Sequence, residues 1–164
     1  MLAKPVVVNS TPLVAFWSIG RLDILILRVL FGEIVIPAAV REEFLSTEKE
    51  LRRQVLRDES WIRVVKLENP NRTGAFSNLD EGEAEVLVLA EELDASLVLI
   101  DERKARRYAE RLNLPLSGTL GVILLAKEEG IVTIVTPLLK AIQKAGLYLH
   151  EDLIAQVLKI AGED

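Results

Sequence analysis

Apolar and polar positions along the chain alternate in a pattern that predicts strands and helices in turn. Short β-branched runs that end on polar residues predict buried strands. These runs lie at 5–9, 33–36, 61–66 and 97–101, with a short fifth near 115–118. Because helical patterns separate the strands, we predict one α/β domain over residues 1–164. Its central sheet is expected to be largely parallel and covered by helices on both faces.

Longer segments with apolar residues three or four positions apart predict the helices. They lie at 12–18, 21–31, 38–45, 48–58, 80–94, 102–112, 119–129, 136–145 and 150–161. Thr11 followed by Pro12 predicts a helix start, and Asp80 with Glu83 forms a capping-box pattern. The segment 68–78 is rich in Asn, Pro, Gly and Ser, and it is predicted to be a flexible loop.

Polar residues at two strand ends are the first candidates for chemistry. Asn9 follows one apolar run, and Asp101 and Glu102 follow another. In open parallel sheets, ligands bind beyond the carboxyl ends of the strands. An amide and two acids at such ends suggest a divalent-metal pocket. Each residue also has a structural alternative, because Asn9 suits local backbone hydrogen bonds and Asp101 suits a helix cap.

An acid at the head of an apolar helix face is the next candidate. Glu83 shares its face with Val86, Leu87 and Ala90, so its carboxyl needs a partner. That partner is either the capping box with Asp80 or a metal ion at the carboxyl edge of the sheet. The sequence leaves both alternatives open.

Four other acids have ordinary surface explanations. Glu42 and Glu43 lie in a short helix after the second strand, where charged side chains usually face solvent. Glu81 and Glu85 lie on the more exposed faces of the helix that carries Glu83, and we expect both to be solvated.

The composition excludes some kinds of site and argues against others. The chain of 164 residues has no cysteine and one histidine, which excludes disulfides and thiolate sites and argues against a histidine-based zinc site. That histidine, His150, is expected near the start of the last helix without a chemical role. The apolar runs fall short of the ~18 residues that a membrane span needs. The first residues lack the pattern of a signal peptide, so we expect a cytoplasmic protein with no membrane partner.

Charge is unevenly distributed. The chain has 20 basic and 25 acidic residues, a net charge of −5 that argues against coating nucleic acid by bulk charge. Five cations nevertheless gather beside the second acidic strand end: Arg103, Lys104, Arg106, Arg107 and Arg111. Helical spacing puts Arg103, Arg107 and Arg111 on one face. That face is either solvated or a surface that contacts phosphate.

Apolar side chains elsewhere suggest packing or assembly. Trp17 and Trp61 are expected to pack in the core or a groove. The last helix carries one apolar stripe, formed by Leu153, Ile154, Val157, Leu158 and Ala161. Packing within the domain and contact with a second chain both explain this stripe. We predict a homodimer that uses the helices from about 136 onward.

The motifs together resemble a known family. They are VVVNSTPLVA, IPAAVREEF, LDEGEAEVLVLA, LVLIDERKARRYA and LSGTLGVILLAKEEG, and they cover nearly the whole chain. Their order resembles the PIN domain, a family of Mg²⁺- or Mn²⁺-dependent nucleases. It is most similar to the PIN-like proteins that are grouped with toxin–antitoxin ribonucleases. The resemblance implies a three-layer α/β/α fold, with a parallel sheet of about five strands in the order 3-2-1-4-5.

The resemblance also implies a set of site residues at the carboxyl edge of that sheet. The metal ligands correspond to Asn9, Glu43, Glu83, Asp101 and Glu102, with Glu42 as the alternative to Glu43 and a register ambiguous between Asp101 and Glu102. Glu43, Glu83 and Asp101 are the catalytic acids. The nucleic-acid contacts are expected from Ser10, Arg103, Lys104, Arg107 and Thr119. The implied cofactor is Mg²⁺ or Mn²⁺, and the implied partners are RNA and an antitoxin protein.

Asn9 departs from the family pattern, which has an acid at this position. An amide oxygen coordinates Mg²⁺ but supplies no charge, so the metal should bind more weakly. Two functions therefore stay open. One is a metal-dependent endoribonuclease, and the other is a catalytically weak or inactive PIN-like module that binds nucleic acid or protein.

Overall fold

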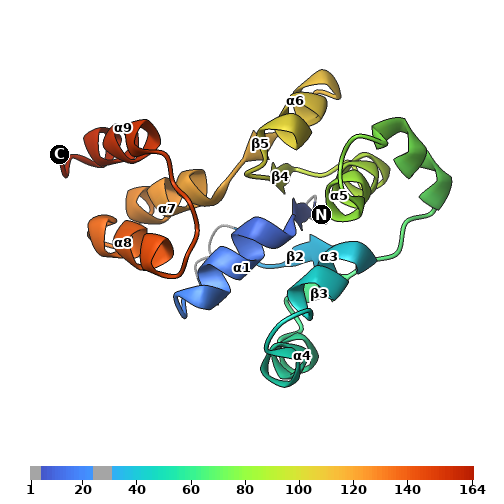
Figure 1. Ribbon diagram of the computed structural model, residues 1–164, viewed down its shortest axis with the longest axis horizontal. Helices are drawn as coiled ribbons and strands as arrows, with labels where there is room; N and C mark the ends of the chain where they lie inside the picture. Colours follow the sequence, from blue (N-terminus) through green and yellow to red (C-terminus); the bar gives the residue numbers. More distant parts are fainter. Residues whose placement is uncertain (1–4, 24–30) are drawn as a thin grey trace.

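The computed structural model describes residues 5–23 and 31–164, and a five-stranded sheet forms its frame (Figure 1). The strands are β1 (Val6–Val8), β2 (Ile34–Ile36), β3 (Ile62–Val64), β4 (Leu97–Leu99) and β5 (Leu116–Ser117). All neighbouring pairs are parallel, in the order β3-β2-β1-β4-β5. The predicted three-layer α/β/α class and the order 3-2-1-4-5 are confirmed.

The apolar runs of the sequence become the buried centre of this sheet. β1 pairs with β2 through Val7 and Val35, and with β4 through Val7 and Val98. Val7 and Val98 are fully buried, and Val35 is 1% exposed. Strands covered on both faces are apolar at successive positions rather than at alternate ones, which explains the continuous runs. At the edge of the sheet, β3 exposes Arg63 and Val64.

Helices flank the sheet close to the predicted positions. They are α1 (Ser10–Ser18), α3 (Ala38–Phe44), α4 (Lys49–Asp58), α5 (Glu81–Glu92), α6 (Arg103–Arg111), α7 (Thr119–Glu128), α8 (Thr136–Lys144) and α9 (Glu151–Ala161). The last three gather at one side of the sheet, coloured orange to red in Figure 1. The helix predicted at 21–31 lies mostly outside the described residues. No helix in the described ranges has the length and apolar character to cross a bilayer.

The start of α1 differs from the prediction. Thr11 and Pro12 do not open the helix, because it already begins at Ser10 with Asn9 as its N-cap residue. Pro12 then occupies the first turn, where its missing N–H removes no intrahelical hydrogen bond. The earlier start places Ser10 and Asn9 directly at the end of β1.

The segment 68–78 is not the irregular loop that its composition predicts. It contains the 3₁₀ helix η1 (Pro70–Phe76). The Glu92 carboxylate on α5 accepts hydrogen bonds from two successive backbone N–H groups before η1, both at 2.9 Å. The Phe76 ring packs edge-on against Tyr108 of α6, with 5.4 Å between the ring centroids. Contacts with distant helices therefore order a segment that looks unstructured locally.

The expected positions of the lone histidine and the two tryptophans are confirmed. His150 is the N-cap of α9, and its Nδ1 accepts a hydrogen bond from the backbone N–H of Asp152 at 3.1 Å. Trp61 is buried. Trp17 packs edge-on against Phe44, with 5.9 Å between the ring centroids.

The apolar stripe of α9 is used mainly inside the domain. Val157 is buried, and Ile154, Leu158 and Ala161 pack against the core. Leu153 alone of the five remains largely exposed. The homodimer expected from this stripe stays a prediction.

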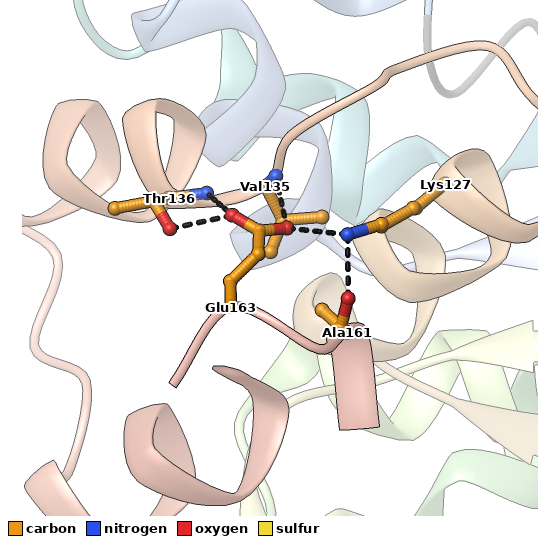
Figure 2. A network of polar contacts seen from close by, with 5 residues as sticks. All are labelled: Lys127, Val135, Thr136, Ala161 and Glu163. Carbon is orange, nitrogen blue, oxygen red and sulfur yellow. Dashed lines mark hydrogen bonds and ion pairs between the residues drawn. The ribbon is translucent and has the colours of Figure 1, made fainter. Parts of the chain in front are cut away.

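The Glu163 carboxylate, after α9, forms hydrogen bonds with both α7 and the start of α8 (Figure 2). Glu163 accepts hydrogen bonds from the backbone N–H groups of Val135 and Thr136 at 2.9 and 3.0 Å, and from the Thr136 hydroxyl at 2.6 Å. Lys127 of α7 donates to Glu163 at 2.8 Å and to the carbonyl of Ala161 at 2.5 Å. These donors, first of all Lys127, lower the pKa of Glu163 to about 2. The same carboxylate thus caps α8 and joins α7 to the end of α9.

Replacing Glu163 tests this contact set through its pH dependence. The folded pKa of about 2 lies below the ordinary value of 4.5, so the charged group stabilises the fold fully above about pH 4.5. That contribution is lost as the pH falls through about 2. We expect Glu163→Gln to melt several degrees lower at neutral pH, and the difference from the wild type to shrink in acid. Thermal melts followed by circular dichroism measure both effects.

The matched control is Glu128→Gln, which removes the same charge from the exposed end of α7. It should melt like the wild type at every pH. A Glu163→Gln deficit that stays constant down to about pH 2 would contradict the assigned role.

Candidate metal centre at the carboxyl edge of the sheet

The ends of β1 and β4 define the centre of the candidate site. The backbone N–H of Asn9 donates to the carbonyl of Leu99 at 3.0 Å, which holds the two strand ends side by side. Asp101 follows β4 two residues later. The topology therefore brings Asn9 and Asp101 to the same edge of the sheet, as parallel pairing requires.

Asn9 is buried there without a hydrogen bond to its amide oxygen. The residue is 4% exposed, and its side chain does not cap α1. Among the described residues, no donor reaches Asn9 Oδ1. Leaving a buried acceptor unpaired costs about 1–3 kcal/mol, so this oxygen is a candidate ligand for a group that supplies positive charge. The expected local hydrogen bonds of the asparagine come from its backbone and not from its side chain.

The structure separates Glu43 from its neighbour Glu42. Glu42 pairs with Arg41 on the surface at 2.7 Å. Glu43 Oε2 instead accepts a hydrogen bond from the Ser10 hydroxyl at 2.6 Å. Its Oε1 lies so close to Gly82 that a Cβ on that glycine would overlap it. The Glu43 side chain, on α3, therefore contacts both Ser10 after β1 and Gly82 at the start of α5.

Glu83 is the most perturbed acid of the site. It is 8% exposed. Asp80 is the N-cap of α5, and its Oδ1 accepts a hydrogen bond from the backbone N–H of Glu83 at 2.8 Å. Burial, the side-chain contact with Asp80 and the negative charges of Asp80 and Glu102 raise the pKa of Glu83 to about 7. No donor among the described residues reaches Glu83 Oε2. Asp80 thus fulfils its half of the predicted capping box, while the Glu83 carboxyl remains incompletely paired.

The acids near Glu83 also affect Glu43. Loss of hydration raises the pKa of Glu43, the Ser10 hydrogen bond lowers it, and the negative charges of Asp80 and Glu81 raise it again. The net direction is upward. The negative charge of Asp80 therefore raises the pKa of both Glu43 and Glu83. The sequence indicated only a capping role for Asp80.

Asp101 and Glu102 have different roles. Asp101 accepts hydrogen bonds from the backbone N–H and the hydroxyl of Thr119, at 2.8 and 2.5 Å. Glu102 is the N-cap of α6 and accepts from the backbone N–H of Lys104 at 3.0 Å. The alternative that Asp101 caps this helix is therefore wrong. Glu102 reaches the cluster through its charge, which contributes to the raised pKa of Glu83.

The prediction that Glu85 is solvated is also wrong. Its carboxylate accepts a hydrogen bond from the backbone N–H of Ala39 at 3.1 Å and is partly buried. It thereby satisfies a free donor in the first turn of α3, and it links α5 to the helix that carries Glu43. Only the packing of α3 on α5 reveals this role.

Across the described ranges 5–23 and 31–164, no three His, Asp or Glu side chains gather closely enough to form a ready-made metal site. The donors present nevertheless fit a hard divalent ion, because all of them are carboxylate or amide oxygens. Two of these oxygens, Asn9 Oδ1 and Glu83 Oε2, are buried without a hydrogen bond. The same donor set suits Mg²⁺ or Mn²⁺ far better than zinc.

A basic cavity adjoins Asp101 on the side of α6. Its volume is about 590 Å³, and its lining includes Asp101, Arg103, Arg106 and Arg107. Lys104 is exposed but does not line the cavity. Arg106 was not among the site residues predicted from the sequence. It donates a hydrogen bond to the carbonyl of Ile100 at 2.7 Å. That bond fixes a guanidinium directly beside the end of β4.

The fold and the site can now be compared with known proteins. A family model described as a PIN domain matches residues 5–163. No curated protein matches the chain in sequence. The family match spans nearly the whole chain and agrees with the parallel sheet in the order 3-2-1-4-5. The chain therefore belongs to the PIN-domain family.

Proposed function

We propose that this protein is a cytoplasmic, toxin-type endoribonuclease that uses Mg²⁺ or Mn²⁺ to hydrolyse RNA phosphodiester bonds. PIN domains have a nuclease-type fold and generally use divalent metal ions, which supports this class of reaction. The observation that supports the proposal for this chain is the pair of buried acceptors, Asn9 Oδ1 and Glu83 Oε2, that no described donor satisfies. Amide and carboxylate oxygens of this kind are the ligands that a hard divalent cation would take.

Five residues would hold the ion in this proposal: Asn9, Glu43, Glu83, Asp101 and Glu102. The bound ion would lower the pKa of a water molecule and stabilise charge on the phosphate. The Ser10 and Thr119 hydroxyls orient Glu43 and Asp101 through their hydrogen bonds. Arg103 and Arg107 supply positive charge for the RNA backbone beside Asp101.

Combined substitution of two acids tests the enzyme. The wild type should cleave a labelled single-stranded RNA in Mn²⁺, and cleavage should stop when EDTA removes the metal. Glu83→Gln with Asp101→Asn should lower the cleavage rate by more than about 100-fold, because two charged ligands are lost. Gel analysis of the products over time measures the rate.

Glu42→Gln is the matched control, since this glutamate neighbours Glu43 but pairs with Arg41 on the surface. Its cleavage rate should equal that of the wild type. Cleavage that survives both EDTA and the double substitution would reject the mechanism.

Asn9→Asp tests whether the neutral ligand limits metal binding. The change adds a negative charge at the end of β1, so we expect Mn²⁺ affinity to rise by about tenfold. Without metal the variant should melt at a lower temperature than the wild type, because the new charge repels the neighbouring acids. Added Mn²⁺ should reverse that loss. Calorimetric titration and thermal melts with and without Mn²⁺ measure these effects.

A melting temperature that falls and that Mn²⁺ does not restore would argue against a metal site. Ser18→Asp is a suitable control, because it adds the same charge at the opposite end of α1. It should leave Mn²⁺ affinity unchanged.

The second candidate function is a non-catalytic PIN-like module that binds nucleic acid or protein. Internal pairing of the acids favours it: Glu43 bonds to Ser10, and Asp101 bonds to Thr119. The neutral Asn9 favours it as well. Calorimetry that detects RNA binding but no Mn²⁺ binding at millimolar concentration would select this module over the nuclease.

The toxin-type proposal includes two protein partners, an antitoxin and a second copy of the chain. For the homodimer, α9 still offers Leu153 and Ile160 as exposed apolar side chains. Ile154, Val157, Leu158 and Ala161 pack within the domain, whereas Ala155 is exposed.

A further inference from the structure

We propose that Tyr148, in the segment between α8 and α9, is a positioning residue whose ring stacks on a base of the RNA strand. The inference rests on the proposed RNA substrate and adds to it the residue that places the strand. Tyr148 lines a cavity of about 200 Å³ together with Asp101 and Thr119. The tyrosine thus lies at the same edge of the sheet as the candidate catalytic acid.

The Tyr148 ring is free to accept a partner. It is 85% exposed, more than any other large hydrophobic side chain in the described ranges. Within those ranges, no hydrogen bond or ring contact joins its side chain to another residue. The other tyrosine is fully engaged, because Tyr108 donates to Asn78 Oδ1 at 2.7 Å and packs against Phe76. The unpartnered ring lies beside Asp101, a position from which it can stack on a bound base.

The Tyr148 cavity adjoins the basic cavity, because Asp101, Leu120 and Leu153 line both of them. Arg103 and Arg107 line the basic cavity but not the Tyr148 cavity. In the proposed complex, phosphates at these arginines place a neighbouring base at Tyr148.

A third cavity continues the same path toward the other acids. Its volume is about 300 Å³, and its lining includes Ser10, Thr11, Glu43 and Leu147. Thr11 and Leu147 also line the Tyr148 cavity. The cavity that Tyr148 lines thus shares residues with two others, one lined by the arginines and one lined by Glu43.

The chemistry of this surface fits an unpaired nucleic-acid strand. Arginines beside it attract phosphates, and an exposed aromatic ring stacks on a base of any sequence. The lining next to Tyr148 includes Ile142, Leu149 and Leu153, which offers apolar contact to a base rather than to a phosphate. A base inside a duplex is already stacked on both faces, so this contact selects an unpaired base.

Fluorescence anisotropy with a short labelled single-stranded RNA tests the proposal, with EDTA present so that cleavage does not interfere. Tyr148→Ala should weaken binding about tenfold, and Tyr148→Phe should bind like the wild type because it keeps the ring. Leu51→Ala is the matched control, since it removes another exposed apolar side chain on α4. It should leave binding unchanged.

A second strand without bases separates stacking from a structural role. Tyr148→Ala and the wild type should bind this abasic strand equally, because the ring has no base to contact. Arg107→Gln should weaken binding of both strands and flatten the salt dependence by about 0.7 in log–log slope. Tyr148→Ala should leave that slope unchanged.

The outcomes distinguish this inference from the proposed function. If the wild type does not bind RNA in EDTA, the stacking role is overturned, while the metal-dependent nuclease is judged separately by the cleavage assay in Mn²⁺. If it binds and Tyr148→Ala binds the intact strand equally well, only the stacking role is overturned. The stacking role is also overturned if Tyr148→Ala loses equal affinity for the abasic strand, or if polyglutamate displaces RNA from the wild type but not from Tyr148→Ala. That last result would assign the tyrosine to an acidic protein segment.

Discussion

Parallel pairing of β1 between β2 and β4 is the constraint on which the site depends. It brings the residues after β1 and β4 to one edge, and the hydrogen bond from Asn9 to Leu99 fixes their spacing. The remaining acids come from α3 and α5, which pack on each other beside that edge. Glu85 strengthens this packing by bonding to the start of α3. Four separate parts of the chain thus contribute residues to this edge of the sheet through ordinary sheet and helix contacts.

Acids placed near one another at this edge repel, which disfavours their charged forms. Hydrogen-bond donors offset this repulsion at some of the acids and not at others. Ser10 and Thr119 donate hydroxyl hydrogen bonds to Glu43 and Asp101. Glu83 lacks a comparable donor, and the rise of its pKa to about 7 shows that its charged form is disfavoured as the protein stands. Asn9, at the end of β1, belongs to the same edge of the sheet. An amide at that position adds no further repulsion, which makes the neutral residue physically reasonable there.

The sequence predicted the elements well because their signals are local. Buried strands are continuous apolar runs, and the helix faces repeat at regular spacing, so most described elements lie within a few residues of their predicted bounds. The misses came from contacts between distant segments. Glu92 orders the segment at 68–78, and Glu85 caps a helix that begins at Ala38. The choice between Glu42 and Glu43 likewise depends on where Ser10 lies.

Gly82 carries a consequence for recognising related sites. It has no functional group, yet a side chain there would occupy the position of Glu43 Oε1 and displace that carboxylate while leaving the backbone in place. A protein with all the acids but a larger residue before the equivalent of Glu83 would keep the fold and lose the arrangement. The small residue therefore belongs to the pattern together with the charged ones, and a search pattern made only of acids would accept sequences in which the equivalent of Glu43 is displaced.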